Sequence, residues 1–183
     1  MNIDRALEVL KKYTTKPNLI KHAIAVSETM RHFAKLEKEN EEYWAVVGLL
    51  HDIDYELYPE QHCHKCVELL KSEGFDNKFI RAVQSHGSEI CTDIAPSCYM
   101  EEALSAIDQL TGFIIACALI RPEKKLEFVT LDSMRKRWKT PSFAAGTERT
   151  RIEGVCARMG KSLDYMLEQT LAALKNIADK LGL

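Results

Sequence analysis

The sequence has no long hydrophobic run, no biased segment and no excess of either charge. Its longest apolar stretch, from Phe113 to Ile120, has eight residues, whereas a membrane-spanning helix needs about 20. The 25 basic and 27 acidic side chains leave a net charge of -2, which argues against a protein dedicated to duplex nucleic acid. The eight glycines and five prolines are scattered, so neither a flexible linker nor an internal repeat is visible.

The amino terminus also lacks the pattern of a secretory signal, because charged residues interrupt it from Asp4 onward. We therefore expect a cytoplasmic protein in which the six cysteines stay reduced. A chain of 183 residues is usually one domain, and it buries roughly 70% of its unfolded surface. We expect a single domain over residues 1–183, and the sequence leaves a homo-oligomer open.

Apolar residues recur at helical spacing through most of the chain, without the sustained alternation that is typical of strands. The expected helices include those at 3–13, 41–52, 59–72 and 98–120. Asn18 is expected to cap the second helix, and later helices are expected to be capped by Asn40, Asp76, Thr130, Thr147 and Ser162. The pattern predicts an all-α fold, a compact bundle of about eight helices.

The helix expected at 41–52 is apolar for most of its length and then ends in adjacent His51 and Asp52. An ionised carboxylate at the end of a buried helix is costly unless a partner compensates its charge. His22 borders the apolar stripe of the second helix, and Asp108 lies among apolar residues of the helix at 98–120. We expect these four side chains, carried by three helices, to converge on a metal ion.

His62 and His86 form a second group of candidate ligands. Imidazole and carboxylate together suit divalent ions such as Mn²⁺, Fe²⁺, Co²⁺, Ni²⁺ or Mg²⁺, and Zn²⁺ less exclusively. Each histidine also has a structural alternative. His22 can be a hydrogen-bonded helix residue, His86 can lie at a helix C-terminus where the dipole favours it, and His64 competes with His62.

A structural zinc site is a rival interpretation of the same region. Cys63 and Cys66 have two residues between them, and histidines are interleaved with this pair. Cys91 and Cys98 follow, but six residues separate them, where a zinc ribbon has two. Cys63 and Cys66 also fit the inward face of the helix expected at 59–72.

His22, the pair His51-Asp52 and Asp108, in this order, resemble the signature of the HD-domain superfamily. The similarity continues through Asp54-Tyr55-Glu56, Pro59-Glu60-Gln61-His62 and Ser85-His86-Gly87, and it spans about residues 18–170. Members are for the most part all-α, metal-dependent phosphohydrolases, and the match is to small stand-alone proteins related to the HDIG subgroup. The resemblance implies that His22, His51, Asp52 and Asp108 hold a first ion, and that His62 and His86 join Asp52 around a second.

The widespread form of the motif has glycine and lysine where this chain has Asp54 and Tyr55. The lysine often assigned to phosphate contact is thus absent, and the resemblance does not identify the phosphate-binding and proton-donating groups. Asp52 is expected to orient the attacking water or to bridge two ions. Glu56 or Asp54 is expected to act as the acid or base, although a solvated loop charge explains Glu56 equally well. Lys136 and Arg149, in the cation-rich segment after residue 121, are the first choices for substrate binding, although a solvated basic helix explains such charges equally well.

The sequence therefore predicts an HD-like domain with a metal-site core at 18–120 and a C-terminal helical extension or lid at 121–183. The expected activity is hydrolysis of a nucleotide or other small phosphoester by metal-activated water, with one or two divalent ions as the cofactor. The expected partner is a small anionic, phosphate-containing substrate, and neither duplex nucleic acid nor a membrane. Two alternatives remain open: a di-iron oxygenase of the same fold, and a non-catalytic sensor or binding module.

Overall fold

The computed structural model describes residues 2–183, and within that range the chain is helical without a strand. The described helices are α1 (Ile3–Tyr13), α2 (Pro17–Glu37), α3 (Glu41–Leu50), α4 (Cys66–Ser72), α5 (Asn77–Ser85), α6 (Tyr99–Leu119), α7 (Leu131–Trp138), α8 (Arg149–Arg158), α9 (Leu163–Lys175) and α10 (Ala178–Leu181), with 3-10 turns at Pro59–Gln61 and Leu126–Phe128. The all-α prediction is confirmed. Nine of the ten described helices have seven residues or more, close to the expected number of about eight, and the tenth is the short α10 that follows α9.

Four of the six expected helix caps are present. The side chains of Asn40, Asp76, Thr130 and Ser162 each accept a hydrogen bond from the backbone N–H three residues later. The prediction for Thr147 is wrong, because α8 begins at Arg149 and Glu148 occupies its cap position without a side-chain hydrogen bond. The prediction for Asn18 is wrong, because α2 already begins at Pro17, whose fixed φ suits the first helical position. Lys16 occupies the cap position without a side-chain hydrogen bond. Instead, the carboxylate of Glu56 accepts hydrogen bonds from the backbone N–H groups of Thr15 and Lys16 at this helix end.

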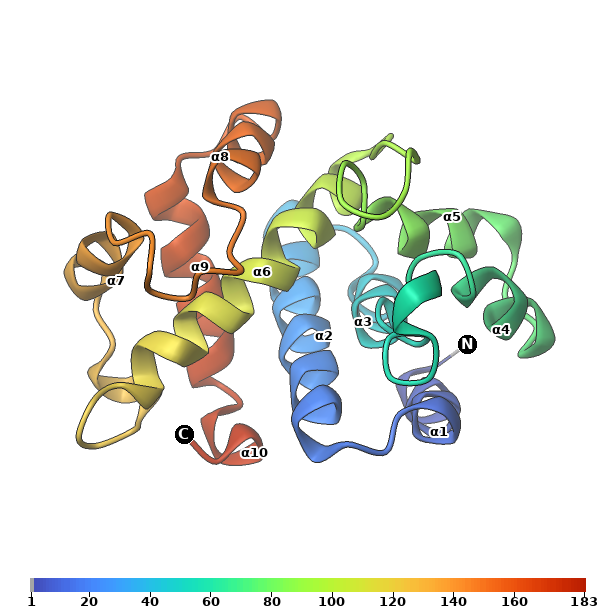
Figure 1. Cartoon of the computed structure of the whole chain (residues 1–183), viewed down its shortest axis with the longest axis horizontal. Coiled ribbons are helices and arrows are strands. Elements are labelled where there is room, and N and C mark those ends of the chain that lie inside the picture. Colours follow the sequence, from blue (N-terminus) through green and yellow to red (C-terminus); the bar gives the residue numbers. More distant parts are fainter. Residues whose placement is uncertain (1) are drawn as a thin grey trace.

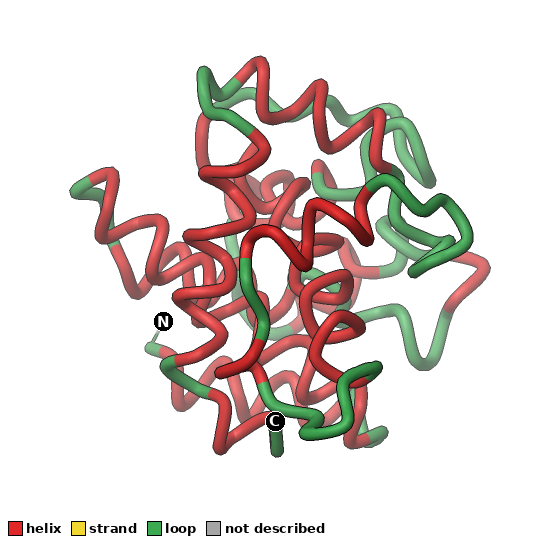
Figure 2. The backbone as a smooth tube through the Cα atoms, turned by 90° about the vertical axis from the view of Figure 1, so that its left-hand side faces the viewer, coloured by secondary structure: helices red, strands yellow, loops and turns green. Residues whose placement is uncertain are grey.

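Helices α2 and α6 form the centre of the molecule (Figure 1). Helix α2 packs against α3, α6 and α9. Helices α1, α3, α4 and α5 lie on one side of α2, and α7, α8 and α9 lie on the other. Figure 2 shows the bundle turned by 90°, with helices joined by loops throughout the described part of the chain. One hydrophobic core connects both sides, from Ala6 in α1 to Leu181 in α10.

Helix α3 is buried from Trp44 to Leu50 and lies close against α2. The two helices come close together at Gly48, where an added Cβ would be 2.9 Å from Cγ of Met30. The helix ends at Leu50, two residues earlier than expected, and His51 and Asp52 follow in a turn. This turn places the side chains of His51 and Asp52 next to His22 of α2.

The helix expected at 59–72 is interrupted, which corrects that prediction. Residues Pro59–Gln61 form a 3-10 turn, and α4 begins only at Cys66. Between them Cys63 has a φ of 64°, in the left-handed region that a residue with a Cβ rarely adopts. The interruption places His62 and Cys63 beside His86, at the end of α5.

Helix α6 is the one helix in residues 2–183 that is long and apolar enough to cross a membrane by length and composition. Most of its residues are buried in the bundle, as in the core helix of a soluble protein. It carries Asp108 midway, and α7, α8 and α9 pack against it. Residues 121–183 thus share a core with the rest of the chain, and the lid function expected of them stays a prediction.

Candidate metal centre

Four of the expected ligands, from three parts of the chain, meet at one point. His22 comes from α2, His51 and Asp52 from the turn after α3, and Asp108 from α6. Nε2 of His22 lies 3.0 Å from Oδ1 of Asp108 and 3.3 Å from Nε2 of His51. Nε2 of His51 lies 3.3 Å from Oδ2 of Asp52. Ligand atoms about 2.1 Å from a common ion are separated by about 3.0–3.4 Å, so this first cluster has the spacing of a metal-ligand set.

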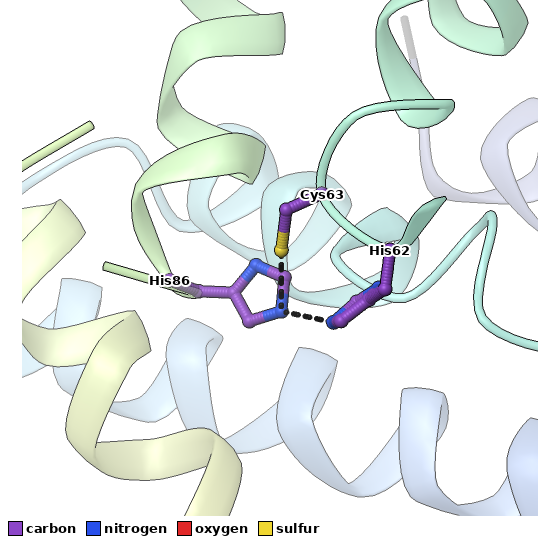
Figure 3. Close-up of side chains that lie close together, drawn as sticks. All are labelled: His62, Cys63 and His86. Atoms are coloured by element: carbon purple, nitrogen blue, oxygen red, sulfur yellow. Dashed lines mark hydrogen bonds between the residues drawn. The ribbon is translucent and has the colours of Figure 1, made fainter. Parts of the chain in front are cut away.

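His62, Cys63 and His86 form a second cluster (Figure 3). Nε2 of His86 lies 3.3 Å from Nε2 of His62 and 3.8 Å from Sγ of Cys63. His64, the rival of His62, has an exposed side chain whose ring bonds the carbonyl of Cys91 at 2.9 Å. The structure therefore brings together the two histidines that the sequence singled out, and it adds a thiol that the sequence did not assign to them.

Asp52 lies between the two clusters. Its Oδ2 is 3.3 Å from Nε2 of His51 and 3.7 Å from Nε2 of His22. Its Oδ1 is 3.4 Å from Nε2 of His86 and 3.5 Å from Nε2 of His62. One carboxylate oxygen thus faces each cluster, and this arrangement allows a carboxylate to bridge two ions.

Hydrogen bonds fix the orientation of three histidines in the clusters. Nδ1 of His51 and Nδ1 of His86 each donate to the carbonyl three residues earlier, at 2.8 and 2.6 Å. Nδ1 of His62 donates to Oδ1 of Asp54 at 2.8 Å. Because a carbonyl only accepts, the Nδ1 atoms of His51 and His86 carry the proton, and in the neutral ring Nε2 has a lone pair.

These lone pairs face other acceptors at short range. Nε2 of His86 faces Nε2 of His62 at 3.3 Å, and Nε2 of His51 faces a carboxylate oxygen of Asp52 at the same distance. Such contacts are repulsive unless a proton or a metal cation lies among the atoms. Metal-bound histidines are held in the same way, with the other ring nitrogen bonded to a carbonyl or carboxylate, so the donor set fits a divalent metal.

The charges of the first cluster also favour a cation. Burial disfavours the charged imidazole of His51, but Asp52 and Asp108 outweigh burial and raise the pKa of His51 well above its usual value. Burial likewise opposes the charged carboxylates, yet the neighbouring histidines hold the pKa of Asp52 and of Asp108 below the usual range. The cluster therefore favours a positive charge at its centre, which a proton on His51 or a divalent cation would supply.

A comparison with models of protein families matches residues 19–181 to the HD domain. The match covers nearly all of the 183 residues and includes both clusters. The chain belongs to the HD-domain family. HD domains are generally metal-dependent hydrolases of the phosphohydrolase superfamily, and they bind divalent metals. Comparison with curated proteins and with solved structures gave no significant match.

In this HD domain Glu56 contacts the start of α2. Its Oε2 accepts hydrogen bonds from the N–H groups of Thr15 and Lys16 at 2.9 and 3.0 Å, and its Oε1 accepts the Thr15 hydroxyl at 2.7 Å. The bond from Lys16, with those from Thr15, lowers the pKa of Glu56. Glu56 is not among the clustered carboxylates, and its expected role as acid or base stays a prediction.

Tyr55 occupies the position at which many HD proteins have lysine. Its side chain is 46% exposed. Its ring packs edge-to-face against His62, with 5.2 Å between the ring centroids. An exposed aromatic ring beside a candidate ligand histidine stands in place of the usual cation, so this HD domain differs from the common pattern next to its second cluster.

The two residues chosen for substrate binding lie outside both clusters. The guanidinium of Arg149 donates to the carbonyl oxygens of Trp138, Thr140, Phe143 and Thr147. Arg149 thereby ties the loop before α8 to the end of α7. Lys136 is exposed on α7. Contact of either side chain with a phosphate group stays a prediction.

Asp54 supports the second cluster in a way that was not expected. The residue is fully buried. Its Oδ1 accepts from His62, and its Oδ2 accepts from the N–H of Cys66 at 2.7 Å. The sequence suggested an acid or base at this position, whereas the hydrogen bonds indicate that Asp54 orients His62 and anchors the start of α4.

Arg151 of α8 supports the second cluster, a role that the sequence did not indicate. Its Nη2 donates to the carbonyl of His86 at 2.7 Å and to Oγ of Ser105 at 2.5 Å, and its Nε donates to the carbonyl of Ser88 at 3.1 Å. These bonds fix the backbone on both sides of Gly87. Arg151 is 65 residues from His86 in the chain, and no local pattern marks such a contact.

The rival zinc site of four cysteines does not form. Sγ of Cys66 donates to the carbonyl of Cys63 at 3.3 Å, and Cys98 is exposed at the start of α6. Neither belongs to a group of possible metal ligands in residues 2–183. Of the four cysteines, Cys63 alone is close to the histidines that form the second cluster.

Proposed function

We propose that this HD domain is a phosphohydrolase that uses two divalent ions to cleave a nucleotide or another small phosphoester. The observation that carries the proposal is the position of Asp52, whose two oxygens face different clusters. His22, His51 and Asp108 would hold one ion with Asp52, and His62 and His86 would hold the other. Ions in such sites supply a Lewis acid and lower the pKa of a bound water to about 7.

Hydrogen bonds within the protein hold the candidate metal ligands in position before a metal binds. The Nδ1 bonds of His51 and His86 keep both rings oriented, so the ligands need little reorganisation when metal binds. Asp54 does the same for His62. Arg151 of α8 secures the backbone of His86 through a hydrogen bond to its carbonyl.

The charge of the loaded site supports an anionic substrate. Two divalent ions outweigh the carboxylates of Asp52, Asp54 and Asp108, and Arg151 adds a further positive charge nearby. A phosphate group matches such a site, because its oxygens carry the charge that cations stabilise during phosphoryl transfer. The histidine-rich donor set favours manganese, iron, cobalt, nickel or zinc over magnesium.

The proposal is tested with metal-free protein reconstituted with each of these ions and assayed on nucleotides, phosphomonoesters and phosphodiesters. We expect hydrolysis of at least one class, and a loss of at least about 100-fold in Asp52→Asn, since an inner ligand is removed. Asp132→Asn, on the exposed side of α7, is the matched control and should keep full activity. Failure of the loaded protein on the whole panel, with Asp52→Asn no different, would contradict the proposal.

The same preparations distinguish the two alternatives. A di-iron oxygenase requires iron-loaded protein with optical and Mössbauer signals of a coupled iron pair, together with consumption of oxygen. A sensor or binding module requires stable metal binding without turnover of any ester. Either result would replace the phosphohydrolase assignment.

A further inference from the structure

The second cluster has four candidate donor atoms. Nε2 of His62 and Nε2 of His86 are 3.3 Å apart, and Oδ1 of Asp52 is 3.5 and 3.4 Å from them. Sγ of Cys63 is 3.8 Å from Nε2 of His86. Metal–sulfur bonds are longer than metal–nitrogen bonds, about 2.3 against 2.1 Å, so a sulfur ligand is expected to be slightly further from its neighbours than a nitrogen or oxygen ligand. These distances follow that order.

We propose that the thiolate of Cys63 is a ligand of the second ion, together with His62, His86 and Asp52. The inference rests on the proposed two-ion function and adds a residue and a ligand type to it. When the ion binds, the sulfur–hydrogen bond breaks, the sulfur–metal bond forms, and the proton passes to solvent.

The backbone of Cys63 supports a specific role for this side chain. Its φ of 64° is unfavourable for a residue with a Cβ. Glycine or asparagine would fill a left-handed position more easily, and the cysteine found there has its sulfur 3.8 Å from Nε2 of His86. The same conformation interrupts the helix expected at 59–72 and brings the sulfur beside His86 (Figure 3).

The surroundings of the sulfur also suit a metal-bound thiolate. Sγ of Cys91 lies 3.0 Å from Sγ of Cys63, close enough to donate its hydrogen to a thiolate there. A hydrogen bond to a ligating sulfur is a common feature of the second coordination shell. Room for the two sulfur atoms comes from Gly87, where an added Cβ would be 2.4 Å from both. The residue after His86 must therefore be glycine for Cys63 to lie where it does.

A thiolate makes the two clusters chemically different. The first offers nitrogen and oxygen only, whereas the second offers nitrogen, oxygen and sulfur. Sulfur ligands select softer ions such as zinc and iron, and they disfavour magnesium. We therefore expect the second cluster to reject magnesium at concentrations that load the first.

The test is a titration of metal-free, reduced protein with Co²⁺, followed by absorption spectroscopy and by elemental analysis of the bound cobalt. Thiolate ligation gives an intense sulfur-to-cobalt charge-transfer band in the near ultraviolet, and nitrogen and oxygen ligands do not. We expect two cobalt ions per chain and a band that disappears in Cys63→Ser. Cys66→Ser, which also removes a buried thiol three residues away, should keep the band, and so should His22→Ala, which alters only the first cluster.

The outcomes separate this inference from the function on which it rests. Two bound cobalt ions without the band, or a band that persists in Cys63→Ser, overturn the role of Cys63 and leave the two-ion site intact. Fewer than two cobalt ions in the wild-type protein overturn the two-ion site itself. Counting free thiols in denaturant shows whether Cys63 and Cys91 have oxidised to a disulfide, and the titration is then carried out on protein in which all six thiols are free.

A second measurement covers the case in which Cys63→Ser does not fold. X-ray absorption of zinc-loaded wild-type protein should show a sulfur neighbour at about 2.3 Å from zinc. A first shell of nitrogen and oxygen alone, with two zinc ions bound, would overturn the proposal without any variant.

Discussion

Nδ1 of His62 donates a hydrogen bond to Oδ1 of Asp54 at 2.8 Å, although the two residues lie on opposite sides of a 3-10 turn. The other oxygen of Asp54 accepts the first N–H of α4, that of Cys66. One buried carboxylate therefore fixes both the ring of a candidate ligand and the start of the helix that follows it.

Asp54→Ala is expected to weaken metal binding at the second cluster by about 10–100-fold, because the ring of His62 loses its orientation. The first cluster should keep its ion, so metal content falls from two ions to one. Equilibrium dialysis followed by elemental analysis measures this change. Asp54→Asn keeps one acceptor oxygen and should have an intermediate effect. Unchanged metal content in Asp54→Ala would contradict the orienting role of Asp54.

Stability of the metal-free protein should depend on pH through the first cluster. The carboxylates raise the pKa of His51, so its contribution is complete below the usual histidine pKa of about 6.5 and is lost as pH rises through the raised value. The lowered pKa values of Asp52 and Asp108 give a contribution that is present above about pH 4 and is lost in stronger acid.

A bound ion replaces the proton on His51, so metal-loaded protein should not lose stability as pH rises. The gain in melting temperature on adding metal is therefore expected to increase from about pH 6 to about pH 9. Thermal unfolding of chelator-treated and metal-loaded samples across this range checks the prediction. A gain that is independent of pH would mean that metal does not replace a proton in this cluster.

Glu56 is expected to stabilise the junction between α1 and α2. Its pKa is lowered by the N–H of Lys16 and by Thr15, so this stabilisation is present above the usual glutamate pKa of about 4.3 and is lost as pH falls through the lowered value. Glu56→Gln should melt at a lower temperature than wild type at neutral pH, and the difference should vanish in acid. Glu60→Gln, exposed on the same loop, is the matched control.

The same variant tests the catalytic role predicted for Glu56. A normal kcat in Glu56→Gln, with a lower melting temperature, indicates a purely structural contact. A large loss of kcat at unchanged melting temperature and metal content would instead support the role as acid or base.

Arg151→Lys is expected to destabilise the protein by about 1–3 kcal/mol, because a lysine cannot satisfy the carbonyl oxygens of His86 and Ser88 and the hydroxyl of Ser105 together. It should also weaken metal binding at the second cluster. Arg158→Lys, on the same helix, alters an exposed pair with Glu102 and should cost at most about 1 kcal/mol. Chemical denaturation and metal analysis measure both effects; equal costs in the two variants would contradict the role assigned to Arg151.

The first cluster was predictable because each of its residues interrupts an apolar helical pattern. His22 borders a stripe, Asp108 lies within one, and His51 with Asp52 ends one. Buried polar and charged groups require partners, and in the structure these four side chains are each other's neighbours. The helical fold was predictable for the same reason, since apolar spacing reports local structure directly.

The second cluster was only partly predictable. Its histidines were recognised, but Cys63 was assigned to a continuous helix, because no sequence signal marks a left-handed residue that is neither glycine nor asparagine. The supporting roles of Arg151 and Glu56 depend on contacts 65 and about 40 residues away in the chain. Such contacts follow from tertiary packing, which periodicity does not encode.

Asp52 has a consequence for how the protein responds to its environment. One oxygen of this carboxylate faces each cluster. In the proposed two-ion site, an ion in one cluster would therefore repel an ion in the other, and each would lower the affinity of the other by the same factor. The fraction of fully loaded protein would then rise gradually with the free metal concentration, through a one-ion form.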